Sequence, residues 1–278
     1  MTGLICSLVV LAGCATTSGT ASQPVSMGPV AKRTPRGEAM GRYITSVYLE
    51  RRGKVDEALS ELEKVPALDK TAATPSLRLI RTYVRAQEFE KARVLAEEIV
   101  KQMPDNPSLW IMLGEIEHQV QHFDAAIQAF NKAIQLNPDN VHGYGALAEV
   151  LEATNDLVSA LEAYETLVKL NPNSAPLQFQ LGATLVRIND REAARGAFKR
   201  ALEINPGFAQ ARYMLGILDV ETDQPEEAIK ELTKYIETRA DDTRALECLT
   251  GALARLHRYD EALARLQTIL SSPNAQPK

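Results

Sequence analysis

The sequence predicts an all-α protein built as a solenoid of seven similar helical hairpins. Alanine recurs every 34 residues without insertion or deletion, at Ala58, Ala92, Ala126, Ala160, Ala194, Ala228 and Ala262. An Asn-Pro pair recurs at the same interval, with its prolines at Pro138, Pro172 and Pro206. Within each unit the apolar residues lie three and four apart, which is helical spacing. A fixed period of this length indicates stacked units that bury their faces against one another.

Composition places the chain among globular proteins. Of its 278 residues, 45% are hydrophobic and 24% are charged, which is a normal balance for a folded domain. The formal net charge is −5 and no long basic run occurs. Nucleic-acid-binding proteins normally carry a basic stripe for phosphates, so we expect no nucleic-acid partner.

The first 14 residues read as a secretory signal. Residues 4–13, LICSLVVLAG, are apolar, but a bilayer span needs roughly 20 such residues, so the segment suits a signal h-region. Leu11-Ala12-Gly13-Cys14 resembles the bacterial lipobox. The resemblance implies cleavage before Cys14, lipidation of Cys14 and a membrane anchor through the attached chains. The alternative is an apolar tail with a chance cysteine, since no lysine or arginine precedes the run.

Residues 15–38 are rich in serine, threonine, glycine and proline, and we expect them to form a flexible tether. By resemblance to Gram-negative sorting, Ala15 after the cysteine implies the outer membrane, facing the periplasm. Cys6 would leave with the signal and Cys14 would be lipidated. Cys248 would then remain alone, so no intramolecular disulfide is expected. Its apolar helical context indicates a small helix residue rather than a nucleophile.

Seven frames divide the remainder: 39–72, 73–106, 107–140, 141–174, 175–208, 209–242 and 243–276. Each predicts helix A at about positions 1–14 and helix B at about positions 18–31. Position 8 holds glycine in three frames, at Gly114, Gly182 and Gly216. Because glycine inside a helix costs about 1 kcal/mol relative to alanine, we expect a second helix to pack closely there, with the recurring alanine as its small partner. Asn-Pro ends helix B, since proline disfavours a helical residue before it.

The repeat resembles the tetratricopeptide repeat. The segment 110–140 carries that family's residues at Trp110, Leu113, Gly114, Ala126, Phe130, Ala133 and Pro138. The resemblance covers 39–276 and weakens in the end frames. It implies a right-handed superhelix in which helices A line a concave groove. It also implies binding of proteins or extended peptides there, without intrinsic catalysis.

The resemblance assigns six helix-A positions to the groove, namely positions 2, 5, 6, 9, 12 and 13 of each frame. The charged candidates are Arg78, Arg81 and Arg85 in the second frame, followed by Glu115, Glu149 and Glu152 with His118 and His142. The fifth and sixth frames contribute Phe179, Gln180, Tyr213 and Met214. The alternative is that these are ordinary solvated helix faces. The carboxylate clamp of chaperone-binding relatives is not expected, because no frame has both its lysine and its asparagine.

No catalytic or metal-binding motif stands out. His118 and His122 are four residues apart, but the glutamate of a metalloprotease helix is missing between them. Two solvated polar residues at a helix end explain them more simply. The sequence therefore predicts a non-enzyme without cofactor or metal.

Three functional hypotheses remain. The first is a lipid-anchored periplasmic scaffold for an envelope machine such as a pilus, secretion or cell-wall complex, similar to pilotin-type lipoproteins. The second is a general repeat adaptor without a lipid anchor. The third is a fragment of a larger secretion, exopolysaccharide or glycosyltransferase protein.

The last helix, expected at about 260–270, suggests a further contact. Its apolar residues are Leu263, Leu266, Ile269 and Leu270. An apolar stripe on an end unit favours self-association or partner docking through repeat seven. The alternative is that the tail folds back, or that Arg255 and Arg265 shield the stripe with their stems.

Overall fold

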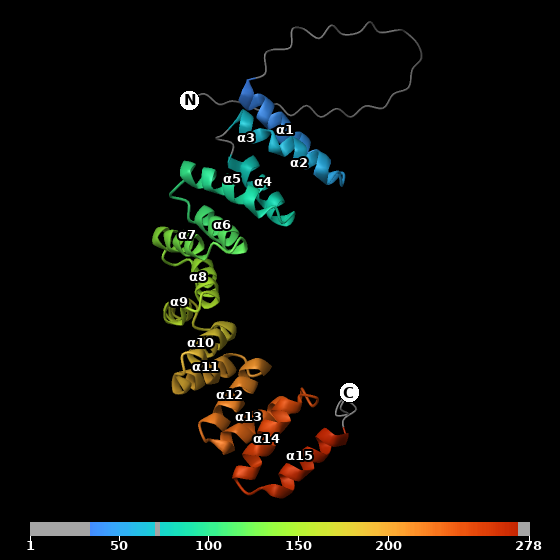
Figure 1. Ribbon diagram of the computed structural model, residues 1–278, viewed down its shortest axis with the longest axis vertical. Coiled ribbons are helices and arrows are strands. Elements are labelled where there is room, and N and C mark those ends of the chain that lie inside the picture. Colours follow the sequence, from blue (N-terminus) through green and yellow to red (C-terminus); the bar gives the residue numbers. More distant parts are fainter. Residues whose placement is uncertain (1–33, 70–72, 272–278) are drawn as a thin grey trace, which may run out of the picture.

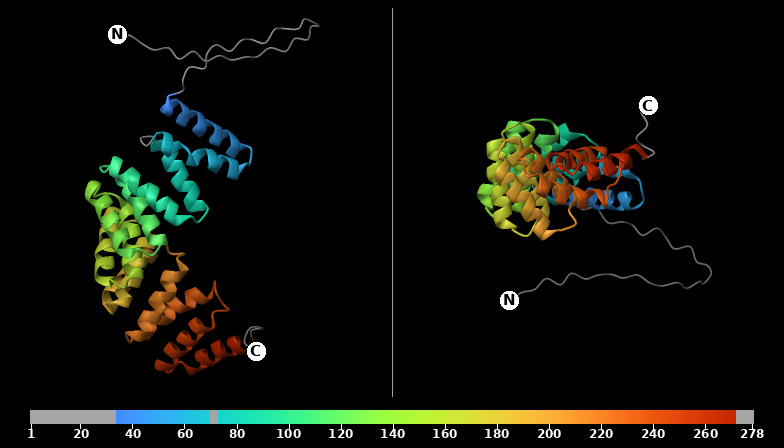
Figure 2. Two further views of the ribbon diagram at one scale, coloured as in Figure 1. Left: turned by 45° about the horizontal axis from the view of Figure 1, so that its top comes forward. Right: turned by 90° about the horizontal axis from the view of Figure 1, so that it is seen from below.

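The computed structural model describes residues 34–69 and 73–271. Within these ranges it contains fifteen α-helices and no strand. The helices stack in consecutive pairs with α1 and α15 at opposite ends (Figure 1), and the stack is coiled rather than straight (Figure 2). The predicted all-α solenoid is therefore confirmed. Cys14 and residues 15–33 of the predicted tether lie outside the described residues.

Seven helices occupy the A positions. They are α1 Pro35–Arg51, α4 Ala73–Arg85, α6 Pro107–Gln119, α8 Val141–Ala153, α10 Ala175–Arg187, α12 Ala209–Glu221 and α14 Thr243–Arg255. From α4 onward each begins at the first residue of a predicted frame. In the first frame α1 begins four residues earlier, and Thr34 Oγ1 accepts a hydrogen bond from Gly37 N at 3.2 Å. The last four residues of the predicted tether are thus helical.

The B positions hold the remaining helices. They are α2 Val55–Glu63 with the short α3 Val65–Leu68, α5 Phe89–Gln102, α7 Phe123–Leu136, α9 Leu157–Leu170, α11 Arg191–Ile204, α13 Pro225–Ile236 and α15 Tyr259–Ser271. In α7, α9 and α11 the C-cap is the asparagine of Asn-Pro, as expected. Asn106 and Asn140 then cap α6 and α8, each accepting a backbone N–H at 3.0 Å.

The turn between helices A and B contains a left-handed residue in every repeat. The series, at position 15, is Gly53, Gln87, Gln121, Asn155, Asn189, Asp223 and His257, with φ between 57° and 76°. Only the first is glycine, so glycine does not mark this turn in the sequence. The residue lets the chain reverse sharply, so that helix B packs back on helix A.

The close contact inside the three hairpins with glycine at position 8 is confirmed, but its partner differs from the expected one. A Cβ at Gly114 would lie 2.6 Å from Phe130 Cε1, and one at Gly182 would lie 2.6 Å from Phe198 Cε1. At Gly216 the nearest atom is Leu232 Cγ, at 2.7 Å. The glycines therefore make room for the large side chain at position 24 rather than for the recurring alanine at position 20. Those alanines are buried in all seven repeats.

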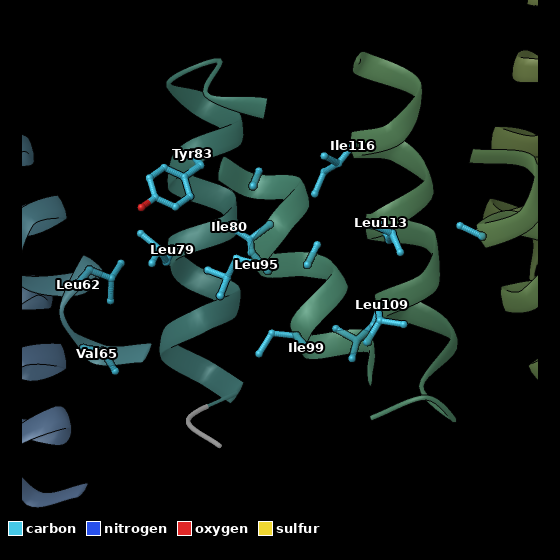
Figure 3. Close-up of a cluster of buried hydrophobic side chains, with 14 of the residues drawn as sticks. Leu62, Val65, Leu79, Ile80, Tyr83, Leu95, Ile99, Leu109, Leu113 and Ile116 are labelled. Atoms are coloured by element: carbon cyan, nitrogen blue, oxygen red, sulfur yellow. The ribbon is translucent and has the colours of Figure 1, made fainter. Parts of the chain in front are cut away.

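Leucine, isoleucine and alanine fill the core between repeats. Figure 3 shows one such cluster, in which side chains of α2 and α3 meet those of α4, α5 and α6. Its labelled members are Leu62, Val65, Leu79, Ile80, Tyr83, Leu95, Ile99, Leu109, Leu113 and Ile116. The substantial contacts between helices join elements one or two apart in the chain. The core is thus a series of neighbouring clusters.

Candidate functional site

A groove of about 1280 Å³ crosses helices α4, α6 and α8. The regular repeat aligns these A helices, so equivalent residues of successive repeats face the same hollow. Its apolar lining includes Leu77 and Val84 on α4, Met112 on α6 and Ala146 on α8. Gly145 lies beside Ala146, and a Cβ there would meet nothing within 4 Å. This apolar lining was not predicted, although Leu77, Met112 and Ala146 occupy the expected groove positions 5 and 6.

The structure brings together half of the predicted binding residues in this groove. Arg81, Arg85, Glu115 and Glu149 all line it, and His118 and His142 join them. The two arginines stand on α4 and Glu149 stands on α8, with α6 between them. All four predicted charged residues are exposed. The groove is therefore basic toward α4 and acidic toward α8.

Three of these charges have no partner in the described part of the chain. Arg81, Arg85 and Glu149 take part in none of its ion pairs or side-chain hydrogen bonds. Glu115 differs, because its Oε1 lies 2.8 Å from His142 Nε2. These three charges are therefore exposed to solvent and unpaired within the described residues.

Two predicted groove residues instead join neighbouring repeats. The Arg78 guanidinium donates to the Glu50 carboxylate on α1, which raises the pKa of Arg78 further. Glu152 accepts from Tyr164 Oη at 3.2 Å and from Thr184 Oγ1 at 3.0 Å. It also accepts from Arg187 Nη1 at 3.1 Å. Neither residue is part of the lining of this groove.

The two predicted aromatic residues are also placed elsewhere. The Phe179 ring packs between the rings of Phe198 and Phe208, with centroid separations of 5.7 and 5.3 Å. The Tyr213 ring lies 5.1 Å from that of Tyr235, and burial raises the pKa of Tyr213. Both side chains are half-buried in the stack and do not line the groove. The position of a residue in the repeat determines which face of the helix it occupies. The size of its side chain determines whether that side chain also packs against residues of neighbouring helices.

The two histidines noted in the sequence have different neighbours. His122 Nδ1 lies 2.9 Å from Glu117 Oε2, at the start of α7. His118 lies instead against Phe123, with ring centroids 5.8 Å apart. Residues 34–69 and 73–271 contain no group of three potential metal ligands.

Two further features concern chemistry outside the groove. Cys248 is half-buried on α14, where burial raises the pKa of its thiol. A thiol that stays protonated is a poor nucleophile, in agreement with a packing role.

Among the helices described, none has the length and apolar content to cross a membrane.

Sequence and structure comparisons identify the repeat. The tetratricopeptide repeat model matches residues 49–116, 118–185 and 185–249, which is more than half of the chain. This chain belongs to the tetratricopeptide repeat family. Tetratricopeptide repeat proteins are typically protein–protein interaction scaffolds, generally without catalysis, and their fold binds peptides or proteins. No curated protein sequence matches the chain.

Solved structures show the same fold. A crystal structure of MamA protein is 26% identical, with a TM-score of 0.55, and the match covers 59% of this chain and 90% of that one. A MamA fragment from Desulfovibrio magneticus RS-1 is 21% identical, with a TM-score of 0.55, covering 61% and 97%. YrrB, described as a tetratricopeptide repeat protein with an unusual peptide-binding site, is 18% identical, with a TM-score of 0.57, covering 64% and 93%.

Proposed function

We propose that this protein is a lipid-anchored scaffold of the bacterial envelope. It captures an extended segment of a partner protein in the groove across α4, α6 and α8, and so assists assembly of a pilus, secretion or cell-wall complex. The family and the groove support the interaction role. The apolar segment before Cys14 and the polar stretch after it support the anchor.

The observation that carries the interaction role is the set of unpaired charges at the two sides of the groove. Arg81 and Arg85 would attract acidic side chains, and Glu149 would attract a basic one. The apolar groups between them would bury apolar side chains of the same segment. The preferred ligand is thus an extended peptide that is acidic at its α4 end, apolar in the middle and basic at its α8 end.

A labelled synthetic peptide of this charge order tests the groove by fluorescence anisotropy. Reversal of both groove arginines, Arg81→Glu with Arg85→Glu, should weaken binding at least about tenfold, which corresponds to about 1.4 kcal/mol. The matched control is Lys199→Glu with Arg200→Glu, which makes the same charge change on exposed positions of α11. Binding should also weaken as salt is added, because the groove charges are exposed.

A steric variant tests the same site without changing charge. Gly145→Trp should fill the groove and abolish peptide binding, because the space beside Gly145 is open. Gly196→Trp is the control, since Gly196 is equally open but exposed on α11. Undiminished peptide affinity in both Gly145→Trp and the double arginine variant would remove the groove from the binding site.

The anchor is tested separately. Cys14→Ser should release the protein into the soluble periplasmic fraction without changing its helicity, because every described helix lies beyond residue 34. If the variant stays with the membrane after a high-salt wash, the protein is not held by a lipid on Cys14.

Self-association through repeat seven is the other part of the proposal. The side chains of Tyr259 and Leu263 on α15 are 55% and 57% exposed. No described helix follows α15 to cover them. The side chains of Leu266, Ile269 and Leu270, which completed the predicted stripe, lie outside the described residues.

A further inference from the structure

The opposite end of the solenoid also carries an uncovered apolar surface. Met40, Ile44 and Tyr48 on α1 are 56%, 61% and 55% exposed. They lie four residues apart, which places them along one side of the helix. No described helix precedes α1. Met40 and Ile44 occupy positions 2 and 6 of their frame. The equivalent residues of the third and fourth frames line the groove, and they are Ser108, His142, Met112 and Ala146. Tyr48 occupies position 10. An end repeat normally presents a polar outer face, so the exposed Tyr48 needs an explanation.

The repeat itself shows what covers the equivalent positions. The residues that correspond to Tyr48 in the last five repeats are all buried: Ile116, Val150, Thr184, Leu218 and Ala252. Four of them, all except Thr184, share a cluster of buried residues with helix B of the preceding repeat. Leu218 of α12, for example, packs in one cluster with Ala194 and Ala197 of α11. The surface around Tyr48 thus has the place in the fold that a preceding helix B would cover.

The junction between α11 and α12 gives the register of such a contact. Arg191 Nε lies 3.5 Å from Glu221 Oε2, and Arg195 Nε lies 2.6 Å from Asp219 Oδ1. The residues two repeats after Arg191 and Arg195 are Tyr259 and Leu263, both on α15. The residues five repeats before Glu221 and Asp219 are Arg51 and Leu49, both on α1.

The end residues are complementary in this register. Leu263 of α15 would lie opposite Leu49, next to the exposed Tyr48, so apolar side chains replace the internal ion pair. Tyr259 would lie opposite Arg51, which is exposed and has no ion-pair partner among the described residues. An arginine over a tyrosine ring is an attractive contact. The two ends are therefore complementary in this register, with leucine facing leucine and arginine facing a tyrosine ring.

We propose that a second copy of this chain stacks head-to-tail, with its α1 covering α15 of the first and continuing the solenoid. The proposal rests on self-association through repeat seven and names the surface that meets it. Because the two contacting surfaces are different, each added copy leaves one surface of each kind free. Since the contact continues the solenoid, the association produces linear chains of copies.

Sedimentation velocity over a concentration series tests this stacking with residues 15–278, which include every described helix. The average mass of the wild type should rise with concentration. Tyr48→Glu and Leu263→Glu should each raise the dissociation constant at least tenfold. Both positions are exposed, so circular dichroism should show unchanged helicity. Val158→Glu is the control, since Val158 is 66% exposed on α9, away from both ends.

Mixing the two variants distinguishes head-to-tail stacking from a symmetric dimer. The Tyr48→Glu copy keeps its α15 end and the Leu263→Glu copy keeps its α1 end. An equimolar mixture should therefore form dimers of one copy of each, with wild-type affinity and no larger species.

Three outcomes would overturn the proposal. A constant monomer mass for the wild type would remove self-association altogether. Dissociation by Leu263→Glu but not by Tyr48→Glu would leave self-association through repeat seven intact and exclude the α1 contact. A wild type that stays monomeric but loses binding to phosphatidylglycerol vesicles upon Tyr48→Glu would assign the α1 stripe to a lipid surface instead.

Discussion

The left-handed residue between helices A and B is the most strained recurring position of the backbone. A side chain with a Cβ costs roughly 1–2 kcal/mol in this conformation, and asparagine or aspartate tolerates it better than glutamine. Asn155, Asn189 and Asp223 follow that preference, whereas Gln87 and Gln121 do not. At these two glutamines the left-handed backbone conformation therefore costs free energy that a glycine would avoid.

We expect Gln121→Gly to raise the free energy of unfolding by about 0.5–1 kcal/mol. The gain is smaller than the relieved strain, because glycine also makes the unfolded chain more flexible. Gln128→Gly is the matched control and should lower stability by about 1 kcal/mol, since Gln128 is exposed inside α7. Urea denaturation of both variants measures the difference. A loss of stability in both would show that the turn carries no such strain.

Asp219 is a buried carboxylate with an incomplete set of partners. Its Oδ1 accepts from Arg195 Nε at 2.6 Å, but Oδ2 has no hydrogen-bond partner, and the residue is 0% exposed. Burial raises the pKa of Asp219, and the Arg195 charge lowers it only in part. The folded protein thus binds this proton more tightly than the unfolded chain does. The stability from this group is present at low pH and is lost as pH rises above the usual carboxyl range.

Asp219→Asn should remove that loss, since an amide keeps an acceptor for Arg195 without a titrating charge. The free energy of unfolding of the variant relative to wild type should therefore increase as pH rises from 4 to 7, the range above the unfolded carboxyl pKa of about 4. Urea unfolding at several pH values measures this. A pH-independent difference between the two proteins would contradict a raised pKa at Asp219.

At the scale of elements, the seam between the two helices of a hairpin depends on glycine only where a large side chain faces it. Gly114 meets the Phe130 ring, whereas Gly145 meets nothing. Gly114→Ala should lower the free energy of unfolding by about 1–3 kcal/mol, because the rigid ring must shift. Gly145→Ala should raise it by about 0.5–1 kcal/mol through helix propensity alone. Equal melting temperatures for the pair would show that the seam does not constrain position 8.

The sequence predicts the elements better than the contacts between them. The 34-residue period places the starts of helices A correctly from α4 onward, because alanine, glycine and Asn-Pro act within one repeat. Arg78 and Arg81 lie on the same helix and both read as groove residues. Only Arg78 forms an ion pair, because Glu50 lies beside it on α1, the helix A of the preceding repeat. The period cannot distinguish the two arginines, since that choice depends on the residues of a neighbouring repeat.

At the scale of the whole molecule, stability is distributed along a line. Substantial contacts join only helices one or two elements apart, so each repeat is stabilised by its own hairpin and by its neighbours. Repeats one and seven have a described neighbour on one side only. Internal repeats should therefore open less often than the end repeats.

Hydrogen exchange of single helices tests this linear arrangement. In the wild type we expect amide protection to be highest in α6–α11 and lowest in α1 and α15. Phe198→Ala removes a fully buried ring in the fifth repeat and should cost about 3–5 kcal/mol. Its effect should extend into the helices on both sides, α8–α9 and α12–α13. Leu253→Ala near the end of the stack should speed exchange in α14 and α15 and leave α6–α9 unchanged. Equal acceleration of all helices by Leu253→Ala would mean that the chain opens as one cooperative unit, and the nearest-neighbour description would fail.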